Sequence, residues 1–171
     1  FGPVGSGSLA DADVKFTGRT GYNYAGVDII SGDLNGDDED DLLIGAIGND
    51  VGGANSGTVY IMPGPLAPGT IAAASVADYI TGEDPNDEIG TPLRAMDLNG
   101  DGVDELLLGA GSNDGGGANS GAVYVVMGPV NGALSLADAD IKYIGESAGD
   151  KLGTSVSSAG DIDGDGTLDF V

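Results

Sequence analysis

MDLNGDGVDELLLGAGSND, residues 96–114, recurs along this chain at a constant spacing. GDLNGDDEDDLLIGAIGND, residues 32–50, matches it position by position, and GDIDGDGTLDFV, residues 160–171, opens a third copy. The three copies begin 64 residues apart. A fixed period of several tens of residues indicates a protein assembled from stacked structural repeats, so the repeat unit is the first object to interpret.

Each repeat contains short apolar clusters, such as LLIGAI, TVYIM, LLLGA and AVYVVM, that are separated by Gly, Asn and Asp. Clusters rich in Val, Ile, Leu and Tyr between turn residues predict β-strands, and helices are not expected. Four antiparallel strands per unit of about 64 residues predict an all-β fold built of β-propeller blades. In the second unit we place these strands near residues 90–97, 105–110, 121–127 and 137–145.

Both ends of the chain fall inside repeats. FGPVGSGSLADAD at residues 1–13 matches MGPVNGALSLADAD at residues 127–140, so Phe1 corresponds to the end of a third strand. Because a propeller closes with about 4–8 blades, we expect an incomplete set, continued in a longer polypeptide or completed by another chain. The expected units are the outer part of a preceding blade (1–18), two blade units (19–82 and 83–145) and the start of a further blade (146–171).

The charge balance is strongly acidic, with 5 Lys and Arg against 28 Asp and Glu and a formal net charge of −23. Such a protein repels the phosphates of nucleic acids and anionic lipids, so no nucleic-acid partner is expected. Apolar residues nevertheless make up 40% of the chain, which favours a folded protein over a disordered one. No stretch approaches the roughly 20 apolar residues of a membrane span, so we expect none in this segment.

The sequence contains no Cys and no His. Their absence removes disulfides, Cys-ligated zinc, cysteine nucleophiles and the commonest general base. No arrangement typical of a catalytic triad is present, and nearly all carboxylate pairs suited to glycoside chemistry lie in the acidic segments. We therefore expect no catalytic residues and no enzymatic activity in this chain.

The acidic segments share the pattern D-x-[DN]-x-D-x-x-x-[DE]. Calcium takes six to eight oxygen ligands, and side chains at alternate positions of a tight loop point at one centre. We therefore predict one calcium ion in each loop, bound by side chains at positions one, three, five and nine and by the carbonyl at position seven. The predicted ligands are Asp33, Asn35, Asp37, Glu39 and Asp41; Asp97, Asn99, Asp101, Val103 and Glu105; and Asp161, Asp163, Asp165, Thr167 and Asp169.

The sixth position of such a loop needs a positive φ, which Gly102 and Gly166 supply. The first loop carries Asp38 there, so we expect its site to be distorted or weaker. The alternative is a set of Asn, Asp and Gly turns without metal. An EF-hand does not fit, because that motif closes at the twelfth residue between two helices.

In their order and spacing, these pieces resemble the FG-GAP repeats of integrin α-subunit propellers and of their bacterial and archaeal relatives. AGVDIISGD, IGTPLRAMD and LGTSVSSAGD precede the acidic loops, IGAIGND and LGAGSND follow two of them, and GTVY and GAVY come next. Ala25, Ile89 and Leu152 stand where the family prefers Phe. The resemblance implies a propeller whose calcium loops join the first two strands of each blade on one face, with ligand contacts on the opposite face.

Tyr22 and Tyr24 are the aromatic residues expected to be exposed on that opposite face, where such side chains can anchor a protein or glycan ligand. Local packing between blades is the alternative for both. The twin segments GNDVGGANSG and SNDGGGANSG are interpreted as hairpin connections, although a further cation or glycan site also fits them. The loops expected on this face are 18–26, 82–90, 145–153, 48–56 and 112–120.

Three functions remain open at this point. The first is a non-enzymatic, calcium-stabilised extracellular propeller module for adhesion or recognition. The second is a structural repeat of a surface fibre, sheath or scaffold, and the third is an accessory domain of a secreted hydrolase or lyase. Weak calcium sites fill at millimolar extracellular calcium but not at cytosolic levels, so we expect an extracellular or cell-surface location. Further repeats of the same or a neighbouring chain are also expected as partners.

Overall fold

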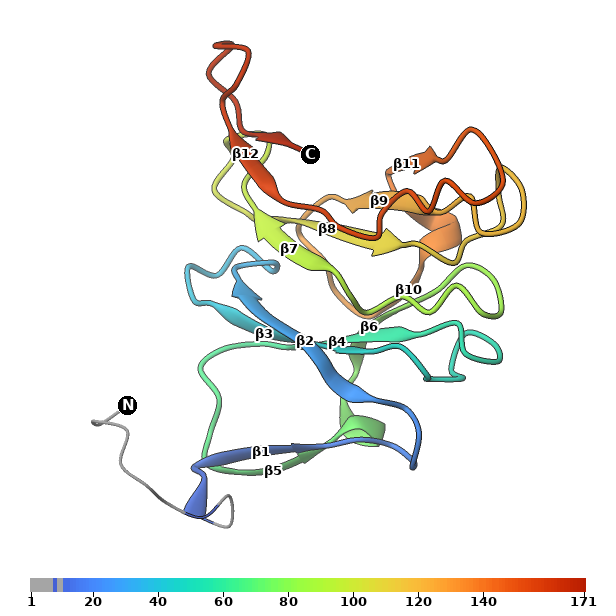
Figure 1. The fold of residues 1–171 in the computed structure, drawn as a ribbon. Helices are drawn as coiled ribbons and strands as arrows, with labels where there is room; N and C mark the ends of the chain where they lie inside the picture. Colours follow the sequence, from blue (N-terminus) through green and yellow to red (C-terminus); the bar gives the residue numbers. More distant parts are fainter. Residues whose placement is uncertain (1–7, 9–10) are drawn as a thin grey trace.

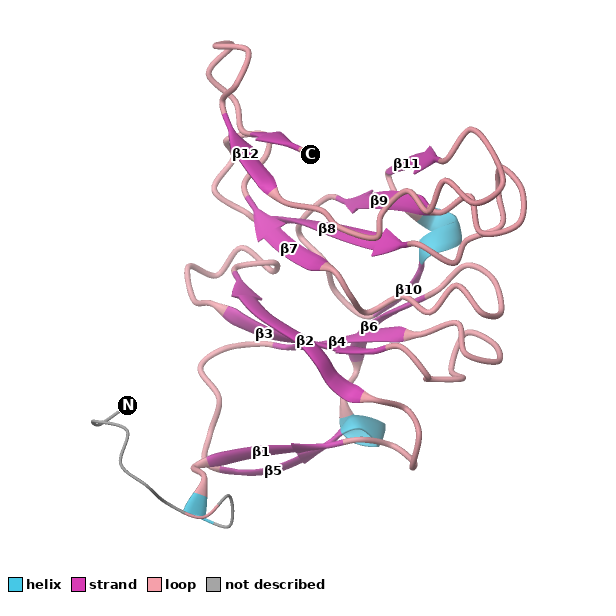
Figure 2. Cartoon of the chain, viewed as in Figure 1, coloured by secondary structure: helices cyan, strands magenta, loops and turns pink. Residues whose placement is uncertain are grey.

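The computed structural model describes Ser8 and residues 11–171. Nearly all of its regular structure is β (Figures 1 and 2). The predicted outer part of a preceding blade (1–18) therefore lies partly outside the described residues. Within the part that is described, no helix is long and apolar enough to cross a membrane.

Two antiparallel four-stranded arrangements form the centre of the molecule and confirm the predicted all-β blade architecture (Figure 1). In each, consecutive strands pair with one another. The strands of the second arrangement match the segments predicted for the second unit to within a few residues. The first consists of β2 (Ala25–Gly32), β3 (Asp41–Ala46), β4 (Thr58–Met62) and β6 (Asp78–Thr81), and the second of β7 (Leu93–Met96), β8 (Glu105–Ala110), β9 (Ala122–Val126) and β11 (Ile141–Ile144).

A third unit begins with the short antiparallel pair β12 (Ser158–Gly160) and β13 (Asp169–Phe170). Figure 1 shows the two central sheets stacked one above the other, with the β12–β13 hairpin beyond the second sheet. The described sheets do not close into a ring, in agreement with the predicted incomplete set.

The connection between the third and fourth strands of each unit contains a strand that the sequence did not predict. β10 (Ala133–Ser135) leaves its own unit and pairs in parallel with β6, the outermost strand of the preceding unit. β5 (Gly69–Ala72) pairs in the same way with β1 (Val14–Thr17). Each of these strands therefore covers a sheet edge that would otherwise expose unpaired backbone groups.

Both added strands lead into a single turn of 3₁₀ helix, so the expectation of no helices was wrong for these two connections. The turns span Ala73–Ser75 and Leu136–Asp138. Short 3₁₀ turns are common connectors and have weak sequence signals, because one turn shows no periodicity.

The central strands are buried on both faces, which explains their continuous apolar sequences. One cluster joins Leu43 and Val59 of the first sheet to Leu106, Leu108 and Tyr124 of the second. The other face of the second sheet packs Leu107, Val123 and Val125 against Val156 of the third unit. Each unit therefore completes its core only by stacking on its neighbours.

Glycine allows the backbones of neighbouring units to approach closely at this junction. A Cβ atom on Gly45 in β3 would lie 1.8 Å from the carbonyl oxygen of Gly90. The same position in the next unit is Gly109 in β8, where a Cβ atom would lie 1.9 Å from the carbonyl oxygen of Gly153. The glycine of the Gly-Ala pair that follows the first two acidic loops is thus a packing requirement between units.

We predict that Gly45→Ala lowers the free energy of unfolding by about 1–3 kcal/mol, because the added methyl group must displace the Gly90 backbone. Urea unfolding followed by circular dichroism measures the change. Gly21→Ala is the matched control, since a Cβ atom there meets nothing within 4 Å. Its effect should stay within about 0.5 kcal/mol. Equal effects of the two substitutions would show that the close approach does not limit stability.

Candidate functional site

The three acidic loops join the first two strands of their units, at the same end of each sheet. The carboxylate of the first Asp anchors each turn by accepting three backbone N–H groups. Asp33 accepts from Gly36, Asp37 and Asp38 at 2.7, 3.2 and 2.9 Å. Asp97 accepts from residues 100, 101 and 102, and Asp161 from residues 164, 165 and 166, all at 2.7–3.1 Å.

The first loop follows the same backbone path as the other two. Asp38 adopts a φ of 68°, in the left-handed region also used by Gly102 (90°) and Gly166 (95°). The N–H of Asp38 reaches the Asp33 carboxylate as the equivalent glycines reach theirs. Asp tolerates this region better than most residues, so the substitution strains the loop without distorting its turn.

The ninth residue of each loop, where the following strand begins, carries the second anchor. Asp41 and Glu105 are fully buried, and each accepts the N–H of the second loop residue, Leu34 at 3.1 Å and Leu98 at 2.7 Å. Asp169 is half-buried and accepts from Ile162 in the same way. The first and ninth residues therefore hold both ends of the loop and direct carboxylate oxygens toward its interior.

The third position distinguishes the loops. Asn35 donates Nδ2 to Asp41 at 3.0 Å, and Asn99 donates Nδ2 to Glu105 at 3.2 Å. The third loop has Asp163 at this position, and carboxylate oxygens of Asp161, Asp163 and Asp169 lie within 4.8 Å of one another. The structure therefore brings three predicted ligands of the third loop together as a cluster of acids without an intervening donor.

The fifth position stabilises the second half of each loop. Asp37, Asp101 and Asp165 accept the N–H of residues 39, 103 and 167 at 3.0, 2.9 and 2.8 Å. Asp165 also accepts the Thr167 hydroxyl, and these bonds hold the pKa of Asp165 below its usual range. The predicted carbonyl ligands Glu39, Val103 and Thr167 thus lie in turns fixed by the preceding acid.

The loop carboxylates carry charge that the described part of the protein does not neutralise. Burial raises the pKa of Asp41 and of Glu105. At Asp33 desolvation acts in the same direction, but the backbone N–H donors hold the pKa below its usual value. Among the described residues the one ion pair is Lys142–Glu83, away from the loops. A bound cation would supply the missing positive charge, so the residues fit calcium.

Sequence reasoning missed a link between successive loops. The Asp104 carboxylate accepts the N–H of Asp33 at 3.1 Å, and the N–H of Asp104 donates to the Asp33 carbonyl at 2.8 Å. Asp104 lies between the predicted ligands Val103 and Glu105, so it joins the second loop directly to the first. The eighth position of the third loop is Leu168, which has no carboxylate. The loop pattern does not specify this position, so nothing in the sequence indicates that Asp104 contacts the first loop.

At the other end of the sheets lie the loops expected on the opposite face. Tyr22 and Tyr24 are 87% and 62% exposed and have φ values of 70° and 53°. Asp50 accepts the N–H of Asn55 at 2.8 Å, and Asp114 accepts that of Asn119 at 2.7 Å. These bonds close the twin hairpin segments on themselves.

Beneath this face, a buried polar cluster joins the loop 82–90, which connects the first and second sheets, to the second sheet. Asp87, 3% exposed, accepts Nδ2 of Asn113 at 3.0 Å and the N–H of Asp84 at 2.9 Å. Asn113 also donates to the Tyr124 hydroxyl, which in turn donates to Glu83 at 2.8 Å. Burial raises the pKa of Asp87, and the nearby carboxylates of Asp84 and Glu83 add to the effect.

Comparison with known proteins agrees with a chain built of repeated β-sheet units with acidic loops. The FG-GAP repeat family matches residues 25–62 and 93–126. The phosphatidylinositol-glycan-specific phospholipase D of Rattus norvegicus is 32% identical over 169 residues, which are 95% of this chain and 20% of the rat protein. Integrin alpha-PS2 of Drosophila melanogaster is 30% identical over 155 residues, 86% of this chain and 10% of the integrin. The chain thus spans a fifth or less of these relatives.

We predict that Asp87 gives the protein a measurable pH dependence of stability. An acid with a raised pKa in the folded state holds its proton more tightly there, so it contributes most stability below its ordinary value of about 4. That contribution is lost as the pH rises through the folded-state value. Urea unfolding at steps from about pH 4 to 7 should show this decline in the native protein and less of it in Asp87→Asn.

Asn23→Asp provides the reciprocal control. Asn23 occupies the position of Asp87 in the first unit, is 5% exposed and donates Nδ2 to the Gly48 carbonyl. An acid there should add a decline of stability with rising pH. An Asp87→Asn protein with the native pH dependence would show that burial of this carboxylate does not control stability.

Proposed function

Because this chain contains FG-GAP repeats at residues 25–62 and 93–126, we propose that it is a calcium-stabilised, non-enzymatic module of an extracellular or cell-surface protein that serves adhesion or recognition. The observation that carries the proposal is the set of acidic loops, each anchored by its first Asp, while the ion pair Lys142–Glu83 lies away from them. The repeated unit is a non-catalytic module, so any chemistry of a longer protein would belong to other segments.

The ions would be held at the five positions of each loop named above. Asp161, Asp163 and Asp169 already place their oxygens together. In the first and second loops, the amides of Asn35 and Asn99 would need to turn their oxygens toward the ion. Calcium supplies positive charge, which would allow the buried Asp41 and Glu105 to remain ionised and would fix the two strands that each loop joins.

The same proposal includes the unit boundaries 19–82, 83–145 and 146–171, with 1–18 belonging to a preceding blade. The cores support these boundaries, since the largest cluster lies between the first and second sheets. The Asp104–Asp33 hydrogen bonds cross the same boundary on the loop face. A calcium ion in one loop would therefore stabilise the junction between units as well as its own hairpin.

A second function is an accessory module of a secreted hydrolase. The similarity to phosphatidylinositol-glycan-specific phospholipase D covers 95% of this chain in the rat protein and 71% in that of Dictyostelium discoideum. The chain covers only 20% and 14% of those proteins. In this case the module would position a catalytic domain elsewhere in the polypeptide, again without catalytic residues of its own.

Removal of calcium tests the proposal. A site filled to about 100 times its Kd adds about 2.7 kcal/mol to stability, so EDTA should lower the melting temperature substantially at millimolar starting calcium. Asp161→Ala should remove one bound ion, whereas Asp163→Asn, which recreates the composition of the other loops, should retain it. Differential scanning calorimetry and elemental analysis measure the two effects. An unchanged melting curve in EDTA would overturn the calcium proposal.

A second experiment tests recognition through the exposed tyrosines. The double variant Tyr22→Asn and Tyr24→Asn should lose binding at least 10-fold, because exposed aromatic anchors contribute most of an interface's affinity. Asn is suitable because Asn86 has a φ of 68° at the place of Tyr22 in the second unit. A glycan array and a panel of extracellular proteins provide the ligands, and an unchanged melting temperature is the control. Native binding by the double variant would remove both tyrosines from the site.

A further inference from the structure

Equivalent polar clusters of the first and second units carry different charges. In the second unit, Glu83 accepts hydrogen bonds from the Tyr124 hydroxyl at 2.8 Å and from Lys142, whose ammonium group also lies 5.3 Å from the centre of the Tyr124 ring. These contacts hold the pKa of Glu83 below its usual range, although desolvation opposes them. The cluster of the second unit therefore contains a complete ion pair.

In the first unit every charge of this cluster is replaced. Arg19 stands in the place of Glu83, one residue after the glycine that begins the loop, and Asn23 stands in the place of Asp87. Tyr79 pairs with Tyr60 in the sheet as Lys142 pairs with Tyr124. The only charge left is that of Arg19, and it forms no ion pair with any described residue.

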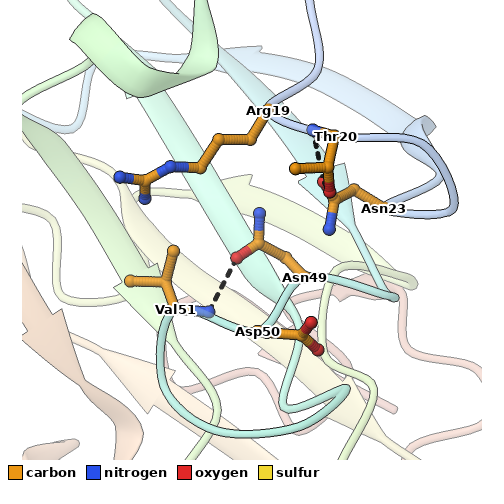
Figure 3. Close-up of a pocket in the computed structure, with 6 residues that line it drawn as sticks. All are labelled: Arg19, Thr20, Asn23, Asn49, Asp50 and Val51. Atoms are coloured by element: carbon orange, nitrogen blue, oxygen red, sulfur yellow. Dashed lines mark hydrogen bonds between the residues drawn. The ribbon is translucent and has the colours of Figure 1, made fainter.

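Arg19 lines a pocket of about 420 Å³ between the loops 18–26 and 48–56. Figure 3 shows its guanidinium on the side of Val51, while the Asp50 carboxylate points away from it. The two amide side chains in the pocket wall already form hydrogen bonds within the protein. Asn49 donates to the Tyr60 hydroxyl at 2.7 Å and accepts from Val51 at 2.9 Å. Asn23 accepts from the N–H and the hydroxyl of Thr20 and donates to the Gly48 carbonyl.

The pocket thus offers a fixed polar wall and the Arg19 guanidinium, which interacts with the Tyr60 hydroxyl, has further N–H donors and forms no ion pair with a described residue. We propose that Arg19 binds a carboxylate of a polypeptide ligand, a single Asp or Glu side chain inserted between these loops. The inference rests on the proposed recognition function and specifies its chemistry. A guanidinium matches a carboxylate in two parallel hydrogen bonds, which gives both affinity and orientation.

The overall charge selects the kind of ligand. With a net charge of −23, the protein repels polyanions, including acidic polysaccharides that carry many carboxylates. A single acidic side chain among neutral or basic residues avoids that repulsion and still reaches Arg19. Tyr22 and Tyr24, exposed in the same loop, would contact residues on either side of it.

The test uses two peptides at physiological ionic strength and saturating calcium. Lys-Gly-Asp-Gly-Lys carries the carboxylate, and Lys-Gly-Asn-Gly-Lys lacks it. Non-specific attraction to an acidic protein favours the Asn peptide, which is more positive, whereas the proposed site favours the Asp peptide. We expect about 10-fold tighter binding of the Asp peptide, in line with the usual strength of a charge-assisted hydrogen bond. Titration followed by the NMR signal of the Arg19 Nε–H group measures binding at the site itself.

Two protein variants, each tested with both peptides, show whether the preference depends on Arg19. Arg19→Gln should lose the preference for the Asp peptide and bind the Asn peptide at least as tightly, whereas Arg94→Gln, which removes an arginine that is not part of the pocket wall, should keep the native preference. Equal binding of the peptides by the native protein, or tighter binding of the Asn peptide, would overturn the proposal. Arg19-dependent binding of galacturonate without binding of the Asp peptide would overturn the polypeptide assignment. Either failure leaves the calcium-dependent melting unchanged, so it is distinct from a failure of the proposed calcium sites.

Discussion

Burial of both faces of the two central sheets is the constraint on which the rest of this structure depends. No unit can satisfy it alone, because Leu106 and Leu108 on one face of β8 need the first unit and Leu107 on the other face needs the third. The stacking brings backbones together at Gly45 and Gly109, where a side chain does not fit. It also places all strand connections at two ends of the stack, where they are free to carry polar chemistry.

The two ends use polar residues in different ways. At one end, each loop closes on itself through a first and a ninth residue that are acidic in all three units, which concentrates negative charge. At the other end, the backbone framework is repeated while the side chains vary. Tyr24, Glu88 and Lys151 have φ values of 53°, 55° and 55° at equivalent places, yet they are aromatic, acidic and basic. The end with the acidic loops is therefore suited to binding the same ion in every unit. The opposite end, where the side chains vary, is suited to distinguishing between ligands.

Neighbouring units are joined by polar contacts that follow no repeat. Asp104 bonds to Asp33 between the first two loops, but Leu168 takes its place in the third. Glu83 and Lys142 form an ion pair in the second unit, while Arg19, at the place of Glu83 in the first unit, forms no ion pair with a described residue. Such differences change the free energy of unfolding little, because the apolar core already holds the units together. The polar side chains of individual units can therefore differ.

The sequence by itself determined the strands, the period and the acidic loops. Runs such as residues 105–110 and the loop pattern at Asp33, Asp97 and Asp161 are local signals, since their physical causes act within a few residues. Only the tertiary structure decided that β10 joins the preceding sheet, that Asp104 reaches Asp33, and that Glu83 pairs with Lys142. The partners in these contacts are up to 71 residues apart, and their pairing depends on how one unit stacks on the next.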